Sequence, residues 1–85
     1  MNEFLYKDIY LGQIVQFPFE ITKEKIQQFL SITGDYNPLH NDENYAKTKG
    51  YDEVVVHGLL TTSALSTLAG MYLPGKYSLI HRYEF

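Results

Sequence analysis

The spacing of hydrophobic residues changes along this chain and predicts its elements. From Gln13 to Ile21 apolar residues nearly alternate with polar ones, and β-branched and aromatic types predominate, which is typical of a half-buried strand. Pro18 makes this an edge or bulged strand, because proline cannot donate a ladder hydrogen bond. Alternation returns from Ser78 to Phe85, where one face would carry Leu79, His81, Tyr83 and Phe85.

A helical period follows the first strand. Ile26, Phe29 and Leu30 fall at i, i+3 and i+4, which indicates an amphipathic helix of about three turns. Thr22 can cap its beginning, and Gly34 is placed to end it.

The second half of the chain predicts two more helices. A short one runs over Asp42 to Lys49 and ends at Gly50, and Val54 to Val56 form an extended run. From Gly58 to Leu73 nearly every side chain is small or apolar, and Pro74-Gly75 end this helix. A helix that is apolar on nearly all sides must be wrapped by other structure.

The predicted strands are too few for that wrapping. Two strands alone are marginal in water, and the last one is followed by no turn. With 85 residues, of which 45% are hydrophobic and 20% charged, the chain has room for one core at most. We therefore expect a single α+β unit over residues 1–85 that is the first part of a larger domain or is completed by a partner chain.

Charge and cysteine content narrow the functional classes. The net charge is -3, and the seven basic residues are scattered, so no nucleic acid partner is expected. Without cysteine there is no disulfide framework, and the N-terminus lacks the layout of a signal peptide. The uncharged stretch after His57 is interrupted by Ser, Thr and Pro, which predicts a buried helix and no membrane span. A cytoplasmic protein is expected.

The polar residues that are candidates for catalysis lie in the stretch TGDYNPLH, residues 33–40. Asp35 and Asn37 are by themselves ordinary turn residues. Because Pro38 fixes its own φ and pushes Asn37 out of helical geometry, a bend there can bring Asp35 and His40 to one point. The stretch thus predicts a rigid, hairpin-like overhang that presents a carboxylate and an imidazole together.

Three segments together resemble one enzyme family. GDYNPLHNDENYA (34–46), VVHGLLTTSALS (55–66) and LPG (73–75) are similar to the (R)-specific enoyl-CoA hydratases of the MaoC-like family, which have the hotdog fold. The similarity runs from about Phe29 to Phe85 without gaps. It implies a long central helix wrapped by an antiparallel sheet whose later strands are absent from these residues.

The resemblance also implies roles for individual residues. Asp35 and His40 would form a catalytic dyad that grips a water molecule, with Asp35 as the main base. The Gly58 amide would stabilise the thioester oxyanion, and Ser66 would assist the dyad region. Asn37 would orient the loop or the acyl group. His57 is the remaining substrate-site candidate, although a helix-start histidine is more often structural.

The implied reaction is the addition or removal of water at a 2-enoyl thioester, which is hydro-lyase chemistry of fatty acid metabolism. It needs no cofactor and no metal, since the coenzyme A thioester is the substrate. Partners would be acyl-CoA or acyl carrier protein substrates and a second copy of the chain in a homodimer or higher homo-oligomer. The alternatives are a module that binds acyl thioesters without converting them, and an inactive fragment that needs a complementary chain.

Several polar residues also have plainer interpretations. Ser66 can hydrogen-bond a carbonyl one turn back, and His81 is expected to pack among aromatic side chains. A metal cluster of His40, Asp42 and Glu43 matches no closed zinc set. Three lysines are either solvated or attracted to the phosphates of the carrier: Lys47, Lys49 and Lys76.

Overall fold

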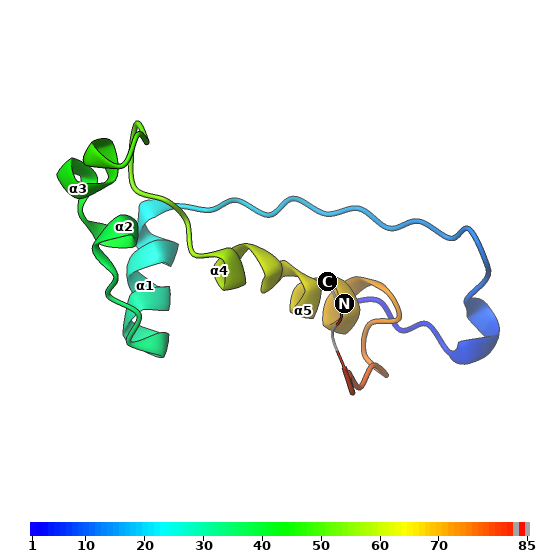
Figure 1. The fold of residues 1–85 in the computed structure, drawn as a ribbon. Coiled ribbons are helices and arrows are strands. Elements are labelled where there is room, and N and C mark those ends of the chain that lie inside the picture. The colour runs from blue at the N-terminus through cyan, green and yellow to red at the C-terminus, as the bar shows by residue number, and fades with distance from the viewer. Residues whose placement is uncertain (83, 85) are drawn as a thin grey trace. The chain divides into compact units, whose positions relative to one another are not determined.

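The computed structural model describes residues 1–82 and 84, which form two compact units. The central unit is Glu20–Thr62, and the terminal unit combines Met1–Phe19 with the described residues from Ser63 onward. Figure 1 labels the α-helices of both units. Each unit has its own short elements and is described by itself.

The central unit begins with α1 (Lys23–Thr33), as its periodicity predicts. The Thr22 hydroxyl accepts a hydrogen bond from the Lys25 amide at 3.1 Å and caps the helix. At the other end Gly34 adopts φ 72° and ψ 13°, the left-handed conformation that glycine tolerates best. Both predicted boundaries of this helix are confirmed.

Three short helices complete the central unit: α2 (Pro38–Asn41), α3 (Glu43–Thr48) and α4 (Gly58–Thr62). The Asp42 carboxylate caps α3 by accepting from the Tyr45 amide at 3.1 Å. Gly50 follows α3 with φ 92°. The predicted short helix is therefore present, one residue inside the expected range at each end.

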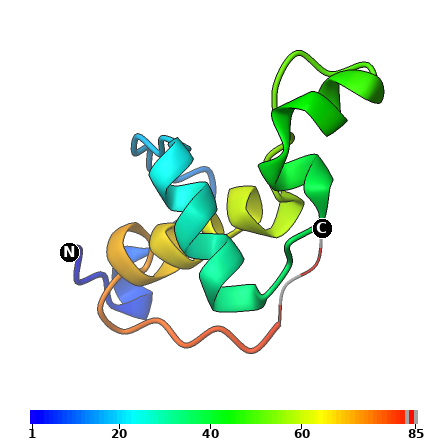
Figure 2. The same cartoon turned by 90° about the vertical axis from the view of Figure 1, so that its left-hand side faces the viewer.

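The core of the central unit lies between α1 and α4. Ile26 and Leu30 of α1 and Leu60 of α4 are buried, and both views show α4 beside α1 (Figures 1 and 2). The partly buried residues around them are Ile21, Phe29, Val54 and Val56. Because one face of α1 is buried, the direction of the backbone after Gly34 is fixed. The segment that follows Gly34 contains the polar stretch.

In the terminal unit the first residues bind the end of the last helix and the segment that follows it. Asn2 donates from its amide to the Met71 carbonyl at 2.7 Å and from its side chain to the Tyr72 carbonyl at 2.9 Å. Its own carbonyl accepts from the Lys76 amide at 2.8 Å. Glu3 forms an isolated antiparallel bridge with Gly75. The ends of this unit are thus joined mainly through backbone hydrogen bonds.

Replacing Gly75 by alanine is expected to loosen that junction. Gly75 is buried, has φ +89°, and has the Asn2 backbone where a Cβ would lie. We expect the free energy of unfolding to fall by about 1–3 kcal/mol, with faster exchange of the Lys76 amide hydrogen. Gly70→Ala is the matched control, because nothing lies within 4 Å of its added Cβ. Equal melting temperatures for the two variants would contradict the prediction.

The two predicted strands do not form in the described chain. Among residues 1–82 and 84 the only β pairing is the bridge between Glu3 and Gly75. Residues 13–21 and 78–82 run without ladder partners, and a strand is held mainly by hydrogen bonds to a neighbour. Tyr83 and Phe85 of the second predicted strand lie outside the described residues. His81, expected to pack among aromatic side chains, is exposed.

The single long helix predicted from Gly58 to Leu73 is not observed; this stretch instead holds three short segments, α4, α5 (Ala64–Thr67) and η2 (Leu68–Tyr72). Thr62 bonds through its hydroxyl to the Leu59 carbonyl at 3.2 Å, and such side-chain bonds compete with the regular helical ladder. In η2 the Leu73 amide reaches back five residues to the Leu68 carbonyl, a wide π-type turn. No described helix is long and apolar enough to cross a membrane.

Candidate active site

The polar stretch begins in the loop between α1 and α2. The Asp35 amide donates to the Thr33 hydroxyl at 3.2 Å, and the Asp35 carboxylate accepts from the Asn37 amide at 3.3 Å. The Asp35 side chain is half exposed, at 49%. Local hydrogen bonds therefore orient this carboxylate while one of its oxygens stays open to solvent and to neighbouring side chains.

The bend at Asn37-Pro38 is the start of a helix, which corrects the predicted hairpin-like overhang. The Asn37 side chain accepts from the Leu39 amide at 3.0 Å, and Pro38 occupies the first helical position of α2. A proline there loses no helical hydrogen bond, and its fixed φ suits the first turn. One helical turn, instead of a hairpin, carries His40 back toward Asp35.

Asn37→Ala is expected to destabilise α2 by about 1 kcal/mol, since alanine cannot cap a helix. Asn37→Asp keeps an accepting oxygen and should retain the native stability. Urea unfolding of both variants measures the difference. If both variants were equally stable but equally impaired toward an acyl thioester, Asn37 would act on the substrate and not as a cap.

His40 is held from the side away from Asp35. Its Nδ1–H donates to the Val55 carbonyl at 2.6 Å, and the Val55 amide donates to the Leu39 carbonyl at 2.9 Å. A carbonyl can only accept, so Nδ1 carries the hydrogen and, in the neutral ring, Nε2 has the lone pair. The His40 side chain is 16% exposed. The extended valine run thus fixes both the place and the tautomer of this imidazole.

Asp35 and His40 face each other across a gap. The distance from Asp35 Oδ2 to His40 Nε2 is 3.9 Å, which is longer than a direct hydrogen bond. Both atoms are acceptors when the ring is neutral. A water molecule that donates one hydrogen to each acceptor spans up to about 4.5 Å between them. The separation of the two acceptors therefore matches that bridged by one water molecule.

His57 joins this pair from the inside of the unit. Its residue exposure is 2%, and its ring stacks on that of His40 with centres 3.8 Å apart and planes 24° apart. His57 Nε2–H donates to the Asp35 backbone carbonyl at 3.2 Å and lies 3.9 Å from Asp35 Oδ2. The Phe29 ring covers another side, at 5.0 Å between centres.

A metal ion is the other occupant to consider for Asp35, His40 and His57, whose ligand atoms lie within 4.8 Å of one another. Two imidazoles on one zinc ion, with nitrogen to zinc distances of about 2 Å, would have ring centres about 5 Å apart. The observed stack is 3.8 Å apart. The rings would have to separate before both could bind one ion, so the arrangement suits a water molecule better.

The two other predicted site residues take different places. Gly58 follows His57 directly and begins α4, so its amide lies one residue from the stacked rings along the chain. Ser66 lies in α5, in the terminal unit, and is exposed. Its amide donates to the Ser63 carbonyl at 3.0 Å. The assistance of Ser66 to the dyad stays a prediction.

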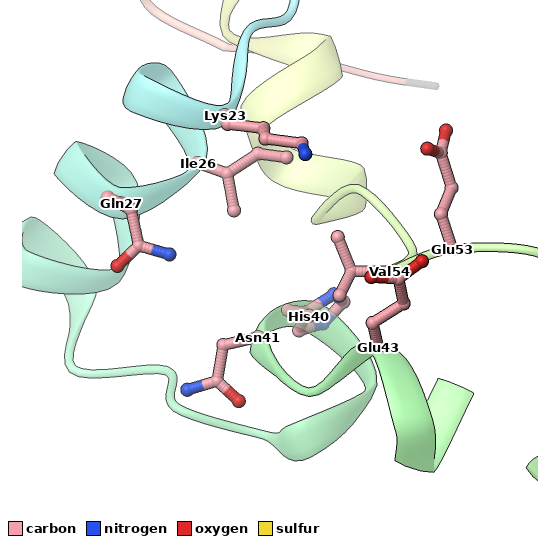
Figure 3. A pocket seen from close by; sticks show the side chains of 8 residues that line it. All are labelled: Lys23, Ile26, Gln27, His40, Asn41, Glu43, Glu53 and Val54. Atoms are coloured by element: carbon pink, nitrogen blue, oxygen red, sulfur yellow. The ribbon is translucent and has the colours of Figure 1, made fainter. Parts of the chain in front are cut away.

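A pocket of about 220 Å³ opens beside His40. Figure 3 shows its lining side chains, which are Lys23, Ile26, Gln27, His40, Asn41, Glu43, Glu53 and Val54. Asp35 and His57 do not line it. Its lining combines charged and amide side chains with the apolar Ile26 and Val54.

The remaining candidates have local partners. Asp42 caps α3, and Glu43 pairs with Lys47 at 3.4 Å. Among the described residues the group of possible metal ligands around His40 contains Asp35 and His57 instead. Lys49 lies 5.5 Å from the centre of the Tyr45 ring. In the terminal unit Lys76 pairs with Glu3 at 3.2 Å. These ion pairs are exposed and contribute little to stability.

The sequence pattern did not single out two participants in the site. Val55 acts through its backbone carbonyl. Every residue has such a carbonyl, so the residue type does not predict which one will accept a hydrogen bond from His40. Phe29 was expected in the helix core, and its contact with His57 depends on how α1 and α4 pack.

Comparison with known proteins identifies the class of domain. The sequence model of the MaoC like domain matches residues 10–85. The chain therefore belongs to the MaoC-like domain family, as the three segments predicted.

Individual relatives carry names from acyl thioester chemistry. An (R)-specific enoyl-CoA hydratase of Aeromonas caviae is 35% identical over 69 residues, 81% of this chain and 52% of the relative. A 3-hydroxybutyryl-CoA dehydratase of Methylorubrum extorquens is 33% identical over 70 residues, 82% of this chain and 45% of the relative. The mitochondrial 3-hydroxyacyl-[acyl-carrier-protein] dehydratase of Arabidopsis thaliana is 28% identical over 65 residues, 76% and 39% respectively. The chain thus spans about half the length of the curated relatives it matches, and no solved structure matches it.

Proposed function

We propose that the protein is a hydro-lyase that adds water to, or removes it from, a 2-enoyl thioester carried by coenzyme A or acyl carrier protein. The observation that carries this proposal is the 3.9 Å gap between two acceptors, Asp35 Oδ2 and His40 Nε2. The names of the relatives agree with it, since they are hydratases and dehydratases.

In the hydration direction the bound water is the nucleophile. Its oxygen forms a bond to the β-carbon as one of its protons passes to the Asp35 carboxylate, with His40 sharing the transfer. The π electrons of the double bond move to the α-carbon and the thioester oxygen. A proton from the pair then bonds to the α-carbon, which leaves both groups in their starting states.

The Gly58 amide is the proposed donor to the thioester oxygen as negative charge develops there. Without a Cβ, glycine lets that oxygen approach its N–H closely. The helix α4 has five residues, so its dipole is small and the contribution comes chiefly from the hydrogen bond. Loss of one such donor typically costs about 2.7–4 kcal/mol of transition-state stabilisation.

The proposal extends to the assembled domain. The segments 13–21 and 78–85, which alternate in sequence but lack ladder partners where described, would join a hotdog sheet around the helix that begins at Gly58. A second copy of the chain would complete the site in a homodimer or higher oligomer. The exposed large hydrophobic residues of these two segments include Ile14 at 79% and Leu79 at 78%, and a sheet would cover them.

The direct test is the hydration of crotonyl-CoA by the native protein, followed as loss of the enoyl thioester absorbance, together with the configuration of the product. We expect the (R)-3-hydroxyacyl thioester. A folded, assembled protein that binds crotonyl-CoA without converting it would instead support a binding module. Comparison with crotonyl-acyl carrier protein as substrate distinguishes the two carriers.

A further inference from the structure

His57 has no role in the reaction as proposed above, yet its side chain contacts both members of the pair. It stacks on the His40 ring at 3.8 Å and donates from Nε2 to the Asp35 backbone carbonyl at 3.2 Å. A single side chain therefore contacts two residues that are five positions apart in the sequence. Its 2% exposure leaves it almost no freedom to move.

The burial of His57 lowers the stability of the fold. Its Nδ1 is buried and has no hydrogen-bond partner among the described residues. An unsatisfied buried polar atom lowers stability, and a phenylalanine ring in this place would carry no such atom. The neighbouring Phe29 ring would suit an apolar ring. Packing alone gives no reason for histidine here.

We propose that His57 is a positioning residue for the Asp35–His40 pair. Its ring blocks His40 from turning away from the gap, and its Nε2–H anchors the backbone that carries the Asp35 carboxylate. His40 is then held between two fixed contacts, the Val55 carbonyl on one edge and the His57 ring on one face. The inference rests on the proposed function, because it assigns His57 to the same water site.

Two substitutions separate the contacts of His57. His57→Phe keeps a planar ring for stacking but loses the Nε2–H, and His57→Gln keeps a donor near that position but loses the ring. Catalytic groups displaced by about 1 Å can lose about 100-fold in rate. We expect His57→Phe to lower kcat for crotonyl-CoA by about 10- to 100-fold with KM within about twofold, while its melting temperature stays the same or rises. His57→Gln should recover part of kcat at lower stability.

The control is His81→Phe, the same change at an exposed histidine of the terminal unit, which should leave kcat unchanged. A His57→Phe protein with native kcat would overturn the proposal, because a purely structural histidine predicts that result. If His57→Phe does not fold, His57→Gln decides by the same criterion, and native kcat in that variant overturns the proposal.

A spectroscopic readout separates this inference from the proposed function. A ring stacked at 3.8 Å shifts the NMR signals of the His40 ring protons, and this shift should persist in His57→Phe and disappear in His57→Gln. If the native protein does not hydrate crotonyl-CoA, the proposed function fails, but the spectra still decide the role of His57. His40 signals that are unchanged in His57→Gln would show that His57 does not position it.

Discussion

Asp35→Asn is expected to lower kcat/KM for crotonyl-CoA hydration by about 10²–10⁴-fold, the usual contribution of a positioned acid or base. Asparagine keeps the size of the side chain and an accepting oxygen, but it cannot take the proton from the attacking water. His40→Gln should have a comparable effect, because glutamine offers no lone-pair nitrogen opposite Asp35 Oδ2. The measurement is the initial rate of hydration at saturating and limiting substrate.

The double variant gives the sharper test of a shared water. Groups that act as a unit give strongly non-additive effects, so Asp35→Asn combined with His40→Gln should be little slower than either single variant. Asp42→Asn is the control, since asparagine caps α3 as well as aspartate does and Asp42 binds the Tyr45 amide. Fully additive losses, or native rates in either single variant, would refute the proposed pair.

Leu30→Ala is expected to destabilise the central unit by about 2–5 kcal/mol, because it removes buried methyl groups and leaves a cavity. Leu30 is 2% exposed and packs in the cluster with Ile26 and Leu60. Folded domains are stable by only about 5–15 kcal/mol, so this loss is a large fraction of the total. Urea unfolding followed by circular dichroism measures it.

Ile32→Ala, on the same helix, is the matched control. Ile32 is 81% exposed, and surface substitutions usually change stability by less than about 0.5 kcal/mol. The same pair of variants also tests the link between core and site. Because α1 leads through Gly34 into the Asp35 loop, Leu30→Ala should lower activity through the folded fraction, whereas Ile32→Ala should not. Equal unfolding midpoints would mean that the α1–α4 core does not hold the central unit together.

The sequence predicted those elements whose bounds depend on nearby residues, such as helix caps and the spacing of apolar side chains. Thr22 and Gly34 marked the ends of α1 because a hydroxyl cap and a left-handed glycine are needed at fixed positions. The spacing of Ile26 and Leu30 identified the face that is buried. The strands predicted at 13–21 and 78–85 do not form in the described residues. A strand needs a neighbouring strand to pair with, and an alternating pattern cannot supply that partner by itself.

For the site, the sequence determined which polar residues lie close together along the chain. It also determined the family, and residues 10–85 match the model of that family. It could not determine the geometry. The helical turn at Pro38 has a local cause, the Asn37 cap. Which nitrogen of His40 carries the hydrogen and whether His57 contacts the pair depended on contacts between segments farther apart along the chain. Only the tertiary structure places the Val55 carbonyl against His40 and the His57 ring behind it. The physical reason is that spacing fixes the local path of the backbone, while packing of α1 against α4 fixes which side chains meet.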